Sequence, residues 1–117
     1  MNIENINFKI EEFIKERDWD QFHTVKNLVM ALTVESAELQ EIFQWMSDKE
    51  SNEIKNNPNV KVNIQDEVAD IFIYLLRIIK KTDINLEEAI YNKIEKNRLK
   101  YPIELAKGNY KKYTEFK

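Results

Sequence analysis

Residues 25–46 read VKNLVMALTVESAELQEIFQWM, and residues 63–81 read NIQDEVADIFIYLLRIIKK. In both stretches the apolar residues recur at the spacing of one face of an α-helix. We therefore predict two long amphipathic helices. The first begins at Thr24 or Val25 and ends at Met46, and the second begins after Asn63, a good N-cap residue, and ends near Lys81.

The whole chain has the composition of an all-α protein. Its 117 residues include one Gly and two Pro, too few for the tight turns of a sheet protein. Helical periodicity also predicts a helix over residues 3–16. A fourth helix begins at Asn85, which forms a possible capping box with Glu88, and stops before Pro102. Residues 17–23 interrupt the period, and the polar stretch 47–61 reads as a loop.

We accordingly expect an all-α, four-helix-bundle-like domain over residues 1–102. Residues 103–117 are expected to form a loosely ordered tail or a subunit arm. Because residues 71–79 are apolar on nearly every side, that segment is expected to be a central helix or a subunit interface. A homo-oligomer, a dimer or a tetramer, is therefore expected.

The bulk composition excludes several classes of function. The 18 Lys and Arg residues and 21 Asp and Glu residues give a net charge of −3, with no basic field to recruit a nucleic acid polymer. The absence of Cys excludes disulfides and thiolate sites and fits a cytoplasmic protein. The apolar run 71–79, interrupted by Arg77, is too short to span a bilayer, and residues 1–12 lack a signal peptide pattern.

Four acidic residues border the apolar faces of the two long helices. At about 100° per residue, Glu35 falls in the middle of the first apolar stripe and Glu38 lies about 60° to one side. On the second helix, Glu67 lies at the edge of the stripe and Asp70 lies beside it. An ionised carboxylate at such a position is costly unless it is paired or bound to a metal.

The four acids therefore predict a divalent cation site. Hard oxygen ligands without Cys favour Mg²⁺, with Mn²⁺ as a possibility, over zinc or copper. The alternative is that these residues are parts of solvated helix faces, since most Glu residues in a highly charged chain lie on the surface. In that case the protein is a non-catalytic helical interaction module.

Other common active sites do not fit the chain. A ferritin-like di-iron site needs Glu-x-x-His on two helices, but the single histidine, His23, has Asp20 and Lys26 at these spacings. There is no convincing nucleophile elbow for a Ser-His-Asp mechanism, and no Gly-rich loop to cradle phosphates. Phosphates would have to bind through metal and cationic side chains.

The ordered set of motifs resembles the MazG-like nucleoside triphosphate pyrophosphohydrolases of the all-α NTP pyrophosphatase superfamily, with most likeness to the dCTP pyrophosphatase branch. The residues that carry this resemblance are Glu16-Arg17-Asp18-Trp19, Gln21-Phe22-His23, Lys26-Asn27-Leu28, the run from Glu35 to Trp45, Asp66-Glu67-Val68-Ala69-Asp70, Tyr74, and Lys93 through Asn97-Arg98 to Tyr101-Pro102.

The resemblance implies a reaction and a metal site. It implies hydrolysis of a nucleoside triphosphate, dCTP or a related or modified nucleotide, to the monophosphate and pyrophosphate. Glu35, Glu38, Glu67 and Asp70 would bind Mg²⁺ and, through it, the triphosphate, with Glu38 also catalytic. Glu41, rotated about 120° from Glu35, is either a base that orients water, a group that supports the metal ligands, or a solvated residue.

The resemblance also implies a set of substrate-binding residues. Aromatic side chains at Trp19, Trp45 and Tyr74 would form the base pocket, although Trp19 and Trp45 read from their sequence context alone as core residues. His23 is either part of that pocket or a structural histidine. Lys93 and Asn97 would approach the phosphates or sugar, or else lie on a solvated helix face. Ile10 stands where close relatives carry a histidine, which leaves the preferred base open.

Overall fold

The computed structural model of the protein describes residues 1–116 and divides the chain into two compact units. The first unit is Met1–Thr82 and the second is Asp83–Lys117. Within residues 1–116 every regular element is helical, which confirms the all-α prediction. No helix of this part of the chain has both the length and the apolar character needed to cross a membrane.

The first unit begins with α1, Ile3–Glu16, as its periodicity predicts. The Asn2 side chain accepts a hydrogen bond from the backbone N–H of Asn5 at 3.0 Å and caps the helix. At the other end Asp18 adopts a left-handed conformation with φ of +52°, which turns the chain so that the N–H of Trp19 bonds back to the carbonyl of Ile14. A short 3-10 helix, η1, follows at Asp20–Phe22.

The second helix, α2, covers Val25–Phe43. Thr24 is its N-cap, accepting from the N–H of Asn27 at 3.2 Å. The predicted end at Met46 was wrong by three residues, because Ser47 must adopt an extended conformation to start the next helix. That next helix, α3, covers Asp48–Asn52 and starts with a capping box between Ser47 and Glu50.

The prediction of a loop over residues 47–61 was also wrong. Besides α3, this stretch holds the 3-10 helix η2, Ile54–Asn56, and the first turn of α4, Pro58–Thr82. Proline suits the first position of a helix because its ring sets a helical φ and its missing N–H would have no intrahelical partner there. Asn57, just before it, accepts from the N–H of Val60 at 3.4 Å. Asn63, predicted as the N-cap, therefore lies inside α4.

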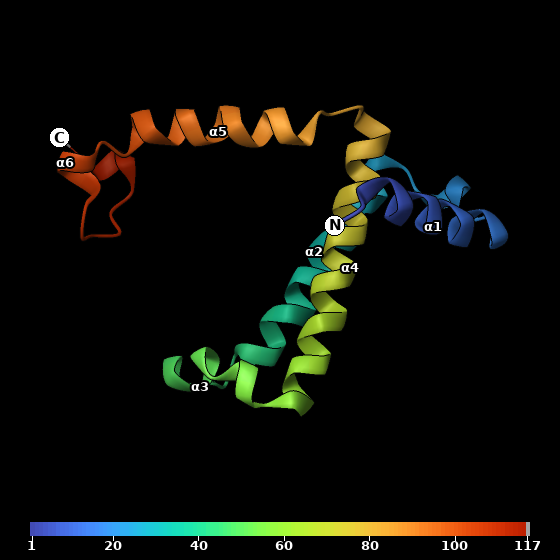
Figure 1. Cartoon of the computed structure of the whole chain (residues 1–117), viewed down its shortest axis with the longest axis horizontal. Helices are drawn as coiled ribbons and strands as arrows, with labels where there is room; N and C mark the ends of the chain where they lie inside the picture. Colours follow the sequence, from blue (N-terminus) through green and yellow to red (C-terminus); the bar gives the residue numbers. More distant parts are fainter. Residues whose placement is uncertain (117) are drawn as a thin grey trace. The chain divides into compact units, whose positions relative to one another are not determined.

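The helices α2 and α4 pack side by side in opposite directions and form the long axis of the first unit (Figure 1). Towards the C-terminal end of α4, α1 packs against that helix. Ile10 and Ile14 of α1 meet Leu76 of α4 in a small buried core, with Ile6 and Phe72 partly buried against it. This arrangement holds α1 and residues 17–23 against the part of α4 that lies C-terminal to Glu67 and Asp70.

The second unit consists mainly of α5, Leu86–Lys100. Asn85 accepts from the N–H of Glu88 at 3.1 Å and caps the helix, but the reciprocal bond of the predicted capping box, from the Asn85 N–H to the Glu88 side chain, is not formed. In the stretch expected to be a tail or a subunit arm, α6, Ile103–Ala106, and the 3-10 helix η3, Tyr113–Glu115, follow. The ring of Tyr101 packs edge-on against those of Tyr113 and Phe116. The last tail residue, 117, lies outside the described part.

Candidate metal and nucleotide site

The packing of α2 on α4 brings three of the four predicted metal ligands together. One carboxylate oxygen from each of Glu35, Glu38 and Glu67 lies within 4.8 Å of the other two. Glu35 and Glu38 lie on successive turns of α2, whereas Glu67 belongs to α4. Asp70 lies one turn beyond Glu67, and its charge contributes to raising the pKa of Glu35.

The environment of Glu35 and Glu67 opposes the ionisation of their carboxyl groups. The Oε2 atoms of Glu35 and Glu67 are buried and have no hydrogen-bond partner among the described residues. Burial, followed by the nearby carboxyl groups of Glu67 and Glu38, raises the pKa of Glu35 to about 7. Burial likewise raises the pKa of Glu67. A bound cation would supply the missing partner and would remove the free-energy cost of ionising these two buried carboxyl groups.

The donor set fits a hard divalent cation. It contains only carboxylate oxygens, the ligands that Mg²⁺ and Mn²⁺ prefer. Within residues 1–116 no Lys or Arg forms an ion pair with Glu35, Glu38, Glu67 or Asp70. The buried, partnerless oxygens of Glu35 and Glu67 are not what a fully solvated helix face would present.

Next to the acids lies a pocket of about 440 Å³ between α1, η1 and α4. Four of the predicted site residues line it together: Trp19, His23, Asp70 and Tyr74. The indole of Trp19 packs edge-on against the ring of Phe13, with centroids 5.7 Å apart. The pocket thus has an aromatic wall of the kind on which a nucleobase stacks.

Tyr74 connects the pocket to the acidic cluster. It lines the pocket, and its pKa is raised by burial and then by the charges of Glu35 and Asp70. Asp70 also lines the pocket. A ligand with an aromatic end in the pocket could therefore extend a polar end toward the carboxylates. An aromatic pocket next to an acidic cluster suits a nucleotide, which has a base at one end and phosphates at the other.

His23 is partly buried in the pocket wall. Its backbone N–H donates to the carbonyl of Asp20 at 3.0 Å, and its Nδ1 atom is buried without a hydrogen-bond partner. Burial, followed by the charge of Arg77, lowers the pKa of His23. At neutral pH the imidazole is therefore uncharged and can both donate and accept one hydrogen bond.

Glu41 lies on the other side of the acidic cluster. A second pocket of about 410 Å³ is lined by Glu38, Glu41 and Glu67 together with Asn63 and Asp66. Asn63 and Asp66 were not among the predicted site residues. Their signal in the sequence is that Asn63, Asp66 and Asp70 follow one another at i,i+3 and i,i+4 spacing, which places them on one side of α4.

The comparisons with known proteins agree with this geometry. The sequence profile of the MazG-like family matches residues 30–116. The chain belongs to the MazG-like family. This match confirms the family resemblance that the sequence motifs indicated.

Two kinds of relative match nearly the whole MazG-like chain. It is 39% identical over 113 residues to dCTP pyrophosphatase 1 of Rattus norvegicus and of Homo sapiens. These matches cover 97% of this chain but 66% of each relative, slightly less than two thirds of their length. A crystal structure of a pyrophosphatase from Archaeoglobus fulgidus DSM 4304 has a TM-score of 0.76 and 39% identity, covering 87% of this chain and 94% of that one.

Three predicted substrate-binding residues do not line the aromatic pocket. Trp45 follows the end of α2 and is 89% exposed, so it is not the core residue that its sequence context alone suggests. Lys93 and Asn97 are exposed residues of α5 in the second unit. The roles of these three residues in nucleotide binding stay predictions.

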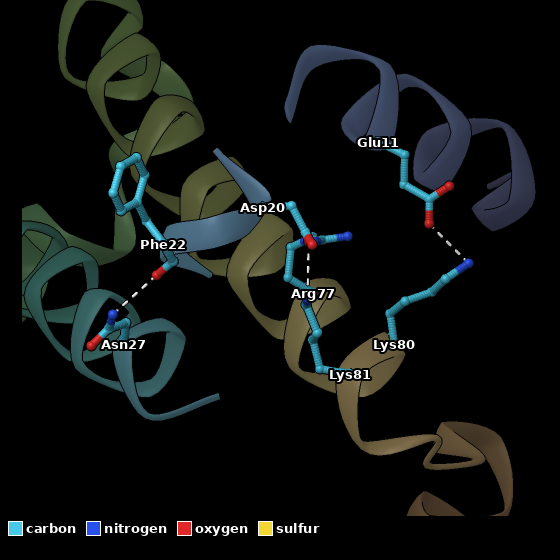
Figure 2. Close-up of polar contacts among 7 residues, drawn as sticks. All are labelled: Glu11, Asp20, Phe22, Asn27, Arg77, Lys80 and Lys81. Atoms are coloured by element: carbon cyan, nitrogen blue, oxygen red, sulfur yellow. Dashed lines mark hydrogen bonds and ion pairs between the residues drawn. The ribbon is translucent and has the colours of Figure 1, made fainter. Parts of the chain in front are cut away.

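The sequence analysis did not name Arg77 as a site residue, but the structure places it in the aromatic pocket. Arg77 is only 6% exposed, and it lines the aromatic pocket together with Tyr74. Its Nη2 atom donates to the Oδ1 atom of Asp20 at 3.0 Å (Figure 2). The signal was present in the sequence, because Arg77 is the one charged residue in the apolar run 71–79.

Proposed function

We propose that this MazG-like protein hydrolyses a nucleoside triphosphate, with dCTP or a related or modified nucleotide preferred, to the monophosphate and pyrophosphate. The observation that carries the proposal is the position of three converging carboxylates beside an aromatic pocket that Asp70 and Tyr74 also line. The names of the relatives, dCTP pyrophosphatase 1 and pyrophosphatase, support the same reaction.

Glu35, Glu38, Glu67 and Asp70 are the residues that would hold Mg²⁺, or Mn²⁺ in its place. When bound, such an ion supplies positive charge that reconciles the carboxylates with an anionic triphosphate and makes a water molecule more acidic. The partnerless oxygens of Glu35 and Glu67 support this assignment.

The protein's own side chains would do the remaining work. We assign to Glu38 and Glu41 the orientation of the attacking water, with a carboxylate oxygen of Glu41 accepting its proton; both residues line the same acidic pocket. Water adds across the bond between the α and β phosphates, so that a monophosphate and pyrophosphate leave. This cleavage separates the reaction from simple removal of the terminal phosphate.

The aromatic pocket would hold the base. Trp19 and Tyr74 offer ring faces, and stacking contributes about 1 to 3 kcal/mol per base. The uncharged His23 offers a hydrogen-bonding atom that lacks a protein partner. Trp45, Lys93 and Asn97 are proposed to complete the site around the base, the phosphates and the sugar, by similarity to the family.

We also propose that the protein is a homo-oligomer, a dimer or a tetramer. Large apolar side chains remain exposed on the first unit, among them Val29, Met30 and Val34 of α2 and Val68 of α4. Burial of such side chains between copies would stabilise an assembly. Sedimentation of the purified protein as a single monomeric species would contradict this part of the proposal.

The decisive experiment measures pyrophosphate release from dCTP and Mg²⁺. We expect pyrophosphate rather than orthophosphate, and we expect Glu38→Gln or Asp70→Asn to abolish its release while circular dichroism stays helical. Glu12→Gln, which alters an exposed acid of α1 outside both pockets, is the matched control and should retain activity. Activity that survives both substitutions would defeat the assignment.

A panel of the common dNTPs and NTPs would then rank the substrates. If no nucleotide is hydrolysed and none raises the unfolding temperature in the presence of Mg²⁺, the chain is better described as a helical interaction module.

A further inference from the structure

The carboxylate of Asp20 receives two cationic side chains from α4. The Nη2 atom of Arg77 lies 3.0 Å from its Oδ1 atom, and the Nζ atom of Lys81 lies 2.8 Å from the same oxygen. Figure 2 shows Asp20 in η1 with both cations approaching from successive turns of α4. The Asp20 side chain is 66% exposed, but its partner Arg77 is buried.

Asp20 stands at the start of the segment that carries two pocket residues. Trp19 precedes it directly, and the N–H of His23 donates to the carbonyl of Asp20. The N–H of Phe22 donates to the carbonyl of Trp19 at 2.9 Å, so that residues 19–23 form one tight turn. The far end of this turn is held by Asn27 of α2, whose Nδ2 atom donates to the carbonyl of Phe22 at 3.0 Å (Figure 2).

Arg77 stands on the face of α4 that forms the opposite wall of the pocket. Arg77 follows Tyr74 by three residues and Asp70 by seven, spacings that keep all three on one face of the helix. All three line the pocket with Trp19 and His23. The contact of Asp20 with Arg77 and Lys81 therefore joins the turn 19–23 to the helix that carries the other half of the site.

We propose that Asp20, Arg77 and Lys81 form a clamp that positions Trp19 and His23 for nucleotide binding, and that Arg77 is a positioning residue of the site. This inference rests on the proposed nucleotide-binding function. Loss of Asp20 leaves the buried guanidinium of Arg77 without its anionic partner, which is far more costly than loss of an exposed ion pair. The turn 19–23 then loses its polar attachment to α4, and the aromatic wall of the pocket is free to shift.

A neighbouring ion pair on the same helix provides a matched control. Lys80 of α4 pairs with Glu11 of α1 at 2.9 Å (Figure 2). Both side chains are substantially exposed, and neither residue lines the aromatic pocket. Glu11→Gln thus removes an ion pair of similar length from the same end of α4 without touching the turn 19–23.

The experiment compares steady-state kinetics of Asp20→Asn, Arg77→Met, the double variant and Glu11→Gln with dCTP and Mg²⁺. We expect Asp20→Asn and Arg77→Met each to raise KM about tenfold, equivalent to 1.4 kcal/mol of binding free energy, with kcat within twofold. The double variant should be no worse than Asp20→Asn alone, because loss of the Asp20 carboxylate already breaks its contacts with both Arg77 and Lys81. Glu11→Gln should leave both constants unchanged.

Several outcomes would overturn the clamp. These are an unchanged KM in folded Asp20→Asn, effects of the two single variants that multiply in the double variant, or a fall in kcat at constant KM. Should Arg77→Met fail to fold, Asp20→Asn decides alone, because the exposed Asp20 side chain tolerates an amide of equal size.

Hydrogen–deuterium exchange without nucleotide tests the clamp independently of the proposed function. Even if the wild-type protein hydrolyses no nucleotide, faster exchange of residues 19–23 in Asp20→Asn than in Glu11→Gln supports the clamp. Equal exchange in the two variants would overturn it.

Discussion

The side chains of Glu35 on α2 and Glu67 on α4 approach each other so closely that a carboxylate oxygen of one lies within 4.8 Å of the other. Each also has a buried Oε2 atom without a hydrogen-bond partner. The packing of the two long helices thus carries an electrostatic penalty at its centre whenever no cation is bound. This penalty has measurable consequences for stability and for the response to metal.

Glu35→Gln should stabilise the metal-free protein at alkaline pH. The pKa of Glu35 is raised to about 7 in the folded protein from 4.5, so the folded state holds a proton that the unfolded state releases, and stability falls as the pH rises between these values. With allowance for solvent screening, we expect the variant to gain about 1 to 2 kcal/mol in free energy of unfolding near pH 8. Urea denaturation with a chelator measures this.

Near pH 4 the same substitution should change little, because Glu35 is then protonated in the folded state and resembles Gln. A loss of stability near pH 8 would show that the Glu35 carboxylate is well accommodated without metal, contrary to the geometry of the cluster.

Mg²⁺ should raise the unfolding temperature of the wild-type protein even without nucleotide. An ion that binds only the folded state adds about 1.4 kcal/mol at ten times its Kd, which corresponds to several degrees for a domain of this size. Differential scanning calorimetry measures the shift, and a chelator should reverse it. Glu67→Gln should show a much smaller shift, whereas the control Glu12→Gln should behave as wild type.

Asp20 should contribute stability that acid removes. The hydrogen bond from Lys81, followed by the charges of Lys81 and Arg77, lowers the pKa of Asp20. The folded state then releases this proton more readily than the unfolded state, so the contribution is complete above the ordinary pKa of 3.8 and disappears as the pH falls through the lower folded-state value. The urea midpoints of wild type and Asp20→Asn should differ near pH 6, and the difference should shrink as the pH falls below 3.8. A constant gap would contradict the ion pairing.

Leu28→Ala should be among the most destabilising substitutions in α2. Leu28 is 1% exposed, and truncation of a buried leucine leaves a cavity that costs about 2 to 5 kcal/mol. Val34→Ala on the same helix removes an exposed side chain and should cost less than about 1 kcal/mol. Chemical denaturation of both variants tests the difference, and equal losses would contradict the burial of Leu28.

Periodicity predicted the helix well where apolar side chains recur over many turns, as in α1, whereas α5 was predicted from Asn85 and Pro102 at its ends. It failed between residues 47 and 61, where helices of one turn are set by single capping residues. Ser47 with Glu50 starts α3, and Pro58 starts α4 six residues before the apolar stripe that Ile64 begins. Such local signals compete with the polar, Asn-rich composition that otherwise indicates a loop.

The amino-acid sequence by itself determined that the protein is helical and that Glu35, Glu38, Glu67 and Asp70 lie beside apolar stripes, because the helical period relates residues three and four apart regardless of the rest of the chain. Only the tertiary structure decided that Glu35 and Glu67 face each other and that Asp20 meets the buried Arg77. These contacts join segments far apart in sequence, and they depend on which helix faces pack together, which no local spacing specifies.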